Sequence, residues 1–372
     1  MDQKSEYAQA GVDYKNIEPF KLAMIEAGKK TVHFPERRGV FVRDDAMHAH
    51  GAAYEYRGNQ PHIWVNTQEG LGNKNWIAEC MYRETGDPHY FNIGHDFVLI
   101  IAHDVLAQGA LPVIFTDEVP VGNDKWFTDK KRSEDLANGI VDICKQIGVA
   151  MPAGESPALR FLLKSEPPVE AAPSLSGCVT GIVAPSKRFI TGAELRPGDH
   201  ILATPSTGLG ANGISLVIKR ALSLPEAFMT KLSDGRTLGE HALIPTREYV
   251  TLIEAMLDAC IDIHALLPAT GSGVSKIAYD DRPYTYIISD WVKEIPLLFR
   301  YMRELGVNLV DCLTTFNWGV GYYIYLPAEE VERAIEVADK AGYQLLDIGV
   351  VKEGKREVIF EPESLTLPPP GE

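Results

Sequence analysis

Two hydrophobic spacings alternate along the chain, and this alternation constrains the fold more than any single motif does. In the first half, β-branched and apolar runs predict strands at 62–66, 110–115 and 176–184. Apolar residues three and four positions apart predict helices at 96–108 and 132–147. Strands and helices that alternate in this way pack as mixed layers, so we expect an α/β or α+β protein.

The second half repeats the alternation after a change of composition. It contains strand patterns at 200–205, 321–327 and 344–351. Helical patterns occur at 214–222, 246–261 and 328–341. Thr246 is a candidate N-cap for the helix at 246–261. Residues 185–199 are rich in Pro, Gly and charge and are expected to connect the two halves. We therefore predict a polar N-terminal arm with loops over 1–60, an N-terminal domain over 61–185 and a C-terminal domain over 186–372, with a loose tail at 364–372.

Composition excludes several classes of function. The 372-residue chain has a net charge of −15, which disfavours sustained binding to a nucleic-acid backbone. Its apolar runs are shorter than the roughly 18–20 residues of a membrane span, and its polar start does not resemble a signal peptide. The five cysteines are widely spaced without a C-x-x-C pair, so we expect reduced cysteines in a cytoplasmic protein.

Acidic residues mark a candidate magnesium–nucleotide site. Asp104 interrupts an apolar helical run, where a carboxylate is costly unless it is paired or binds a metal. Asp96 lies at the expected start of the same helix, about 80° away around its axis, and is more simply a charge favourable to the helix dipole. Glu69 and Glu155 each lie in a glycine-containing turn, and hard carboxylate oxygens beside phosphate-binding backbone suit Mg²⁺.

Glycine-rich turns point to a phosphate-containing ligand. The stretch 208–213 reads GLGANG between an expected strand and helix, as in dinucleotide-binding folds, but Glu226, the available acidic residue, follows no convincing strand. An NAD-dependent oxidoreductase is therefore disfavoured, whereas an anion site on backbone N–H groups and a plain tight turn both stay open. Similar small-residue turns occur at 70–74, 270–273 and 316–321. His48 and His50 are expected to face water in the polar arm.

The order of the motifs resembles that of the aminoimidazole ribonucleotide synthetase family, also called phosphoribosylformylglycinamidine cyclo-ligases. The matching segments are YAQAGVD (7–13), GLGNK (70–74), IGHDFVLIIAHDVLAQGALPVIF (93–115), AGES (153–156), LIPTREYV (243–250) and TFNWGVG (315–321). They follow the family's order at plausible spacing along the whole chain. The resemblance implies two α+β domains and a homodimer formed through the N-terminal domain sheets.

The resemblance also implies an activity. It is the ATP-dependent closure of formylglycinamidine ribonucleotide to aminoimidazole ribonucleotide, with ADP and phosphate released. Such chemistry asks the protein mainly for positioning and charge neutralisation. Mg²⁺ and ATP are the implied cofactor and co-substrate, and a phosphorylated ribonucleotide is the implied substrate. The alternatives are another ATP-using enzyme or a nucleotide-sensing protein on the same fold.

Family positions transfer to this sequence residue by residue. Asp104 and Glu155 match the implied catalytic carboxylates, and together with Glu69 they form the implied metal set. The implied ATP-binding residues are Gly70, Gly72, Lys74, Asn212 and Gly213.

Two family histidines are replaced, by Gly210 and Pro268, and the asparagine before Asp104 becomes His103. Either backbone N–H groups and nearby lysines have taken over phosphate binding, or the substrate has changed.

Overall fold

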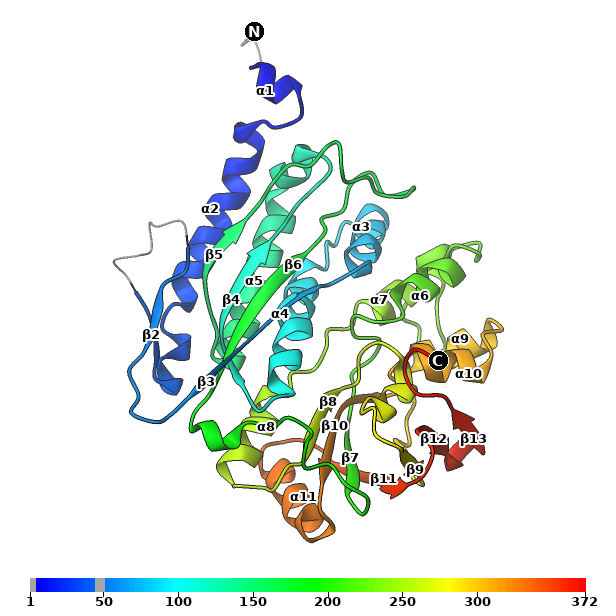
Figure 1. The fold of residues 1–372 in the computed structure, drawn as a ribbon. Helices are drawn as coiled ribbons and strands as arrows, with labels where there is room; N and C mark the ends of the chain where they lie inside the picture. Colours follow the sequence, from blue (N-terminus) through cyan, green and yellow to red (C-terminus); the bar gives the residue numbers. More distant parts are fainter. Residues whose placement is uncertain (1–4, 44–50) are drawn as a thin grey trace.

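A computed structural model describes residues 5–43 and 51–372 of the chain. His48 and His50 lie outside the described residues. Two β-sheets form the centres of two layered units, with helix α4 between them (Figure 1). This arrangement agrees with the expected α+β class.

The first sheet contains four strands in the order β3-β6-β4-β5. Its strands are β3 (Ile63–Gly70), β4 (Leu111–Glu118), β5 (Ala150–Glu155) and β6 (Ser176–Val183). β6 pairs antiparallel with β3 and with β4, whereas β4 and β5 are parallel. β3 continues through Gln68–Gly70, which we had expected to be a turn, so Glu69 lies at the end of a strand.

Helices cover one face of this sheet (Figure 1). They are α2 (Tyr14–Thr31), α3 (Lys74–Thr85), α4 (Tyr90–Leu106) and α5 (Lys130–Ile147), preceded by the short α1 (Glu6–Gln9). α4 and α5 approach closely because glycines meet at their crossing. A Cβ placed on Gly139 would lie 2.2 Å from the Phe91 carbonyl oxygen, and one on Gly94 would lie 2.8 Å from the Ile140 nitrogen.

The opposite face of the first sheet is covered only in part. The two-stranded sheet of β1 (Val40–Val42) and β2 (Tyr54–Tyr56) packs there around a small cluster that includes Val40, Ile114 and Ile182. Farther along, Asn66, Cys178 and Thr116 occupy neighbouring strands on this face. Asn66 is exposed, and Cys178 and Thr116 are partly exposed.

The second sheet contains seven strands in the order β13-β12-β9-β11-β7-β10-β8. These are β7 (His200–Pro205), β8 (Ala265–Pro268), β9 (Tyr284–Ile288), β10 (Val320–Leu326), β11 (Leu346–Glu353), β12 (Glu357–Phe360) and β13 (Leu365–Leu367). The accompanying helices are α6 (Ile214–Ala221), α7 (Leu238–Ala242), α8 (Val250–Asp258), α9 (Leu297–Glu304), α10 (Leu309–Thr315) and α11 (Val331–Lys340). That the two sheets mark separate domains at the predicted boundaries stays a prediction.

Three sequence expectations need correction. Residues 14–31 are not arm or loop but an 18-residue helix that buries Ile17, Phe20 and Met24 against the first sheet's helices. The tail is not loose, because β13 pairs with β12 and Leu367 is fully buried. The 246–261 helix is shorter, α8 beginning at Val250, so Thr246 is not its N-cap.

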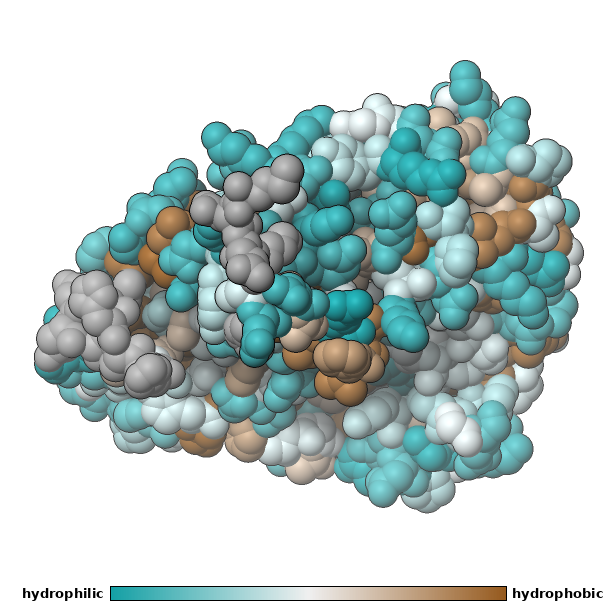
Figure 2. Space-filling model, turned by 90° about the horizontal axis from the view of Figure 1, so that it is seen from above, coloured by the Kyte–Doolittle hydropathy of each residue, from teal (hydrophilic) through white to brown (hydrophobic). Residues whose placement is uncertain are grey.

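Seen from above, the molecule shows mainly hydrophilic residues, with hydrophobic residues in small separate groups (Figure 2). Among the described residues, no helix is both long enough and apolar enough to cross a membrane.

The α4–α5 contact gives a first testable prediction. Gly139→Ala should lower the free energy of unfolding by about 1–3 kcal/mol, because its methyl group would overlap the α4 backbone. Urea unfolding monitored by circular dichroism measures the change. The control is Asn138→Ala, at an exposed position of the same helix, which should change stability by less than about 0.5 kcal/mol. Equal stability of both variants would contradict the close packing.

Candidate functional site

Helix α4 carries two carboxylates with different surroundings. It begins at Tyr90 rather than near residue 96, so Asp96 lies in the helix interior and not at the N-terminus as we expected. The Asp96 carboxylate is buried and forms an ion pair of 2.7 Å with Lys74, and both side chains are fully buried. The backbone N–H of Thr246 donates a second bond to Asp96, at 2.8 Å. Asp96 therefore joins the two halves of the chain instead of supporting the helix dipole.

Lys74 is the N-terminal residue of α3 and points into the protein. Its ammonium group also donates to the carbonyl oxygen of Ile244, at 3.0 Å. With its charge buried against Asp96, Lys74 does not present a cation to solvent. The structure thus gives Lys74 a positioning role at the β3–α3 turn, and direct contact with ATP stays a prediction.

Asp104, two turns farther along α4, faces a cavity between the halves. This interdomain cavity has a volume of about 850 Å³ and is bounded by the end of β3, the end of α4, β8 and the segment 276–281. Its charged lining consists of four carboxylates and one ammonium group, from Glu69, Asp104, Asp280, Asp281 and Lys276. The structure therefore brings together two of the three predicted metal ligands, Glu69 and Asp104.

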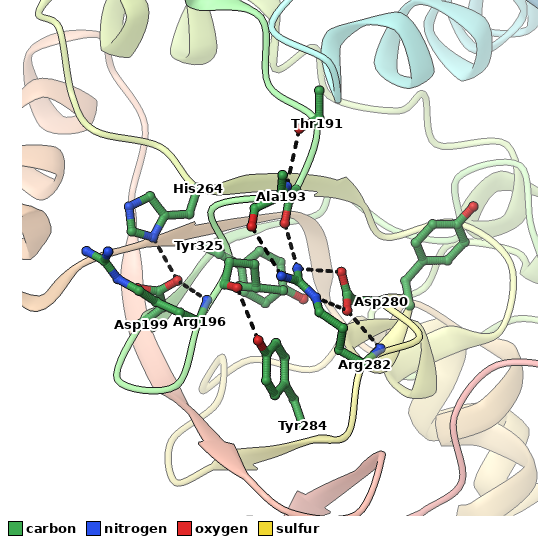
Figure 3. Close-up of polar contacts among 12 residues, drawn as sticks. Thr191, Ala193, Arg196, Asp199, His264, Asp280, Arg282, Tyr284 and Tyr325 are labelled. Atoms are coloured by element: carbon green, nitrogen blue, oxygen red, sulfur yellow. Dashed lines mark hydrogen bonds and ion pairs between the residues drawn. The ribbon is translucent and has the colours of Figure 1, made fainter.

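The wall of the interdomain cavity is fixed by hydrogen bonds from the connection between the halves (Figure 3). Arg282 pairs with Asp280 and donates to the carbonyl oxygens of Gly192, at 2.6 Å, and Ala193, at 3.2 Å. Nearby, buried His264 contacts Asp199 at 2.8 Å. These contacts hold residues 192–199 against the second sheet, so the cavity has a defined shape on that side.

Electrostatics in the cavity differ from those in water. Burial raises the pKa of Asp104 to about 6, the positive charge of Lys276 opposes the rise, and Glu69 adds to it. Burial also lowers the pKa of the neighbouring His103 to about 3, so that imidazole is neutral at physiological pH. The His103 ring packs against Tyr249 with 5.0 Å between ring centroids, inside the interface between the halves.

Glu155 is not part of the interdomain cavity. It ends β5 beside Glu118 and is exposed. The paired residues across the sheet are Gly70, Ser176, Glu118 and Glu155, in that order. Three strand spacings therefore separate Glu155 from β3, a distance of about 14 Å. The same pairing puts the Glu155 side chain on the sheet face opposite to that of Glu69. It lies close enough to help raise the pKa of Asp117, which burial brings to about 7. The position of Glu155 therefore does not support the predicted catalytic and metal-binding roles, which stay predictions.

The first glycine turn borders a different cavity. Gly70 ends β3, and Gly72 adopts a left-handed φ of +71° with open space beside it. Gly72 and Asn73 line a cavity of about 960 Å³ together with Arg160 and Lys164. Glu166 and Glu170 line the same cavity, so its two cations are balanced by two carboxylates, and the glycine backbone is the feature that suits an anionic ligand. The β3–α3 turn thus separates this glycine-turn cavity from the interdomain cavity.

The second glycine turn packs against residues 315–317. Gly213 is the N-cap of α6, and a Cβ there would meet the Phe316 ring at 2.6 Å. Asn212 and Gly210 line a small cavity that also includes His103. Gly210 has a φ of +65°, a conformation that disfavours a histidine at this position. Asn212 and Gly213 therefore lie near the interface between the halves, and their contact with ATP stays a prediction.

Lys276 was missed by the sequence analysis. It belongs to a 3₁₀ turn, Gly273–Ala278, directly after the TGSG segment. A lysine three residues after a glycine turn was the available indication, but a single lysine in an unassigned loop is a weak one. Among the described residues, no group of three or more His, Cys, Asp or Glu side chains is arranged to hold a metal ion.

Comparisons with known sequences agree with the motif order. Residues 57–183 match the model of the family described as AIR synthase related protein, N-terminal domain. The phosphoribosylformylglycinamidine cyclo-ligase of Alkaliphilus oremlandii is 33% identical over 305 residues, which cover 80% of this chain and 84% of the relative. The phosphoribosylformylglycinamidine cyclo-ligase of Rippkaea orientalis is 30% identical over 362 residues, which cover 96% of this chain and 99% of the relative.

Solved structures show the same fold at lower identity. The hydrogenase maturation protein HypE in complex with ATP is similar with a TM-score of 0.55 and 18% identity, over 84% of this chain and 86% of that one. Thiamine-monophosphate kinase from Stenotrophomonas maltophilia K279a is similar with a TM-score of 0.57 and 18% identity, over 92% of this chain and 95% of that one.

The buried ion pair gives a second prediction. Lys74→Met should cost about 3–5 kcal/mol of stability, because it leaves the Asp96 carboxylate buried without its cation. The double variant that also carries Asp96→Leu should lose less stability than the sum of the losses in the two single variants, as measured by urea unfolding. Lys130→Met, which removes an exposed partner of Glu134, serves as the control and should cost less than about 1 kcal/mol. A Lys74 variant as stable as this control would refute the structural role of the pair.

Proposed function

Because this chain belongs to the phosphoribosylformylglycinamidine cyclo-ligase family, we propose that it closes formylglycinamidine ribonucleotide to aminoimidazole ribonucleotide with ATP. Relatives that carry this name match over most of their own length. The observation that supports the activity most directly is the interdomain cavity, in which Glu69, Asp104 and Lys276 line one space. Carboxylates that can hold a cation, together with an ammonium group, are suited to a reaction whose main demand is charge neutralisation.

In the proposed reaction, the formyl amide oxygen of the substrate attacks the γ-phosphorus of ATP, and the bond from that phosphorus to the ADP oxygen breaks. The amidine nitrogen then attacks the activated carbon and closes the ring. The bond between that carbon and the phosphorylated oxygen breaks, so the oxygen leaves within inorganic phosphate, and the protons lost as the ring becomes aromatic pass to phosphate and solvent. The protein supplies orientation and a partly dry cavity, in which fixed charges act more strongly than in water.

A divalent cation fits the carboxylates of this cavity. The Glu69 charge contributes to the raised pKa of Asp104, and a cation between the two would relieve that repulsion. Glu69 and Asp104 would hold Mg²⁺ together with phosphate oxygens and water, because two carboxylates provide only part of its coordination. When bound, Mg²⁺ would neutralise charge on the phosphates of ATP.

The nucleotide has room beside the β3–α3 turn. Glu69 faces the interdomain cavity and Gly72 lines the glycine-turn cavity, so an ATP molecule that crosses this turn would contact both. HypE, which shares the fold, was solved in complex with ATP, and this supports the proposal. The five cysteines are free thiols, which supports the proposed cytoplasmic location.

A coupled assay tests the activity. Purified protein with ATP, Mg²⁺ and formylglycinamidine ribonucleotide should form aminoimidazole ribonucleotide and release ADP in equal amounts. If ATP binds but the ribonucleotide neither binds nor stimulates ADP release, the substrate has changed along with the residues at Gly210 and Pro268, and the proposed activity is wrong.

Asp104→Asn should reduce turnover or the affinity for Mg–ATP at least tenfold, about 1.4 kcal/mol, because it removes a charge from the cavity while keeping the side chain's size. Steady-state kinetics and calorimetric titration with Mg–ATP measure the two effects. Asp339→Asn, on α11 and outside the cavity, is the control. Glu155→Gln should have a smaller effect than Asp104→Asn, and unchanged kinetics in a folded Asp104→Asn variant would remove Asp104 from the site.

We also propose a homodimer formed through the first sheet, whose uncovered face includes Asn66, Thr116 and Cys178. Sedimentation velocity at micromolar concentration should give a species of twice the 41.0-kDa chain mass. Cys178→Arg should shift it to the monomer, because a charged side chain would be buried in the proposed contact. An active wild-type monomer would contradict this proposal.

A further inference from the structure

Lys276 is the cation of the interdomain cavity. Among the described residues that line this cavity, it is the one Lys or Arg side chain, and the acidic residues of the lining are Glu69, Asp104, Asp280 and Asp281. Asp280 is already paired with Arg282. Its backbone is held in the Gly273–Ala278 turn, in which Val274 and Ile277 are buried. A Cβ on Gly273 would lie 2.3 Å from the Leu313 carbonyl oxygen, so the turn packs tightly against α10. The position of the Lys276 main chain is therefore well defined.

The ammonium group of Lys276 is only partly satisfied by the protein. It donates a hydrogen bond to the Thr270 hydroxyl oxygen, which leaves two of its three donor hydrogens for other partners. Among the described residues, no ion pair within 4.0 Å joins Lys276 to Asp104 or Glu69. Burial lowers the pKa of Lys276, and the two carboxylates act in the opposite direction. The cation and the carboxylates thus face each other across space that a ligand can occupy.

Pro268 lies in the same cavity, at the end of β8. The family resemblance implies a histidine at this position, whereas proline offers no charge and no backbone donor. Lys276 restores a cation to the cavity wall that Pro268 helps to form. A lysine ammonium is a compact charge that suits phosphate oxygens.

We propose that Lys276 binds a phosphoryl group in the interdomain cavity, as the cation that compensates for the absent histidine. The inference rests on the proposed function for the identity of the ligand. Two sources carry the same chemistry there, namely the γ-phosphoryl group of ATP and the 5′-phosphate of the ribonucleotide. The position of Lys276 opposite Glu69 and Asp104 favours the γ-phosphoryl group, since those carboxylates would hold the metal ion that accompanies ATP.

Calorimetric binding to Lys276→Met and Lys276→Arg tests the proposal. If the γ-phosphoryl group is bound, Lys276→Met should weaken binding of a non-hydrolysable ATP analogue roughly 10- to 100-fold and leave ADP binding unchanged. If the 5′-phosphate is bound instead, the same variant should weaken the binding of aminoimidazole ribonucleotide. The binding of its unphosphorylated riboside should then be unchanged. Lys276→Arg should keep most of the affinity in either case, because it retains the charge. Lys340→Met, at an exposed lysine of α11, should behave as wild type.

A second measurement uses the wild-type protein and so does not depend on the variants' folding. Acetylation of lysines followed by mass spectrometry should show Lys276 protected by the ATP analogue or by inorganic phosphate, and Lys340 unprotected. Equal affinities of wild type and Lys276→Met for all four ligands, or acetylation of Lys276 that no ligand slows, would overturn the proposal. Absence of ribonucleotide binding to wild-type protein, with the ATP-analogue effect intact, would instead refute the proposed function and keep the phosphoryl site.

Discussion

The packing of α4 between the two sheets is the contact on which the rest of the molecule depends. One side of this helix is held to α5 by the close approach at Gly94 and Gly139. Its other side is held to the second half by Asp96, which accepts a hydrogen bond from the Thr246 backbone, and by the Tyr322 hydroxyl, which donates to the His103 carbonyl oxygen at 3.0 Å. These bonds fix the rotation of α4, and that rotation directs Asp104 into the interdomain cavity.

The same helix therefore uses two carboxylates in opposite ways. Asp96 is buried with a matched cation and a hydrogen-bond donor, so its charge is satisfied within the protein. Asp104 has a raised pKa and faces Glu69 and Lys276 across open volume, so its charge is available to a ligand. A buried pair contributes to the specificity of the fold, whereas an unsatisfied carboxylate in a cavity is typical of a functional site.

Periodic hydrophobic segments made much of the fold predictable from the sequence. The helix predicted at 132–147 and the strand predicted at 200–205 match α5 and β7 closely, because their apolar spacing is regular. The helix at 14–31 was missed because lysines and glutamates separate its few buried residues, and Pro19 lies inside it. The start of α4 was missed because its N-cap, His89, makes no side-chain capping bond.

The site was predictable only in part, since its residues come from distant segments. Asp104 could be found because a carboxylate in an apolar helix is locally anomalous. Lys276 could not be found, because its role depends on lining the same cavity as Asp104, which lies far away in the sequence. Glu155 illustrates the reverse error. Its motif is that of the family, but strand order and face place it away from Asp104.

In the proposed reaction, a phosphoryl group is transferred to the substrate's amide oxygen in this cavity. The most direct measurement uses formylglycinamidine ribonucleotide labelled with ¹⁸O at the formyl oxygen. The label should leave in inorganic phosphate, with one labelled oxygen for each aminoimidazole ribonucleotide formed. Product formation with unlabelled phosphate would contradict it, because the oxygen would then have left without carrying the phosphoryl group.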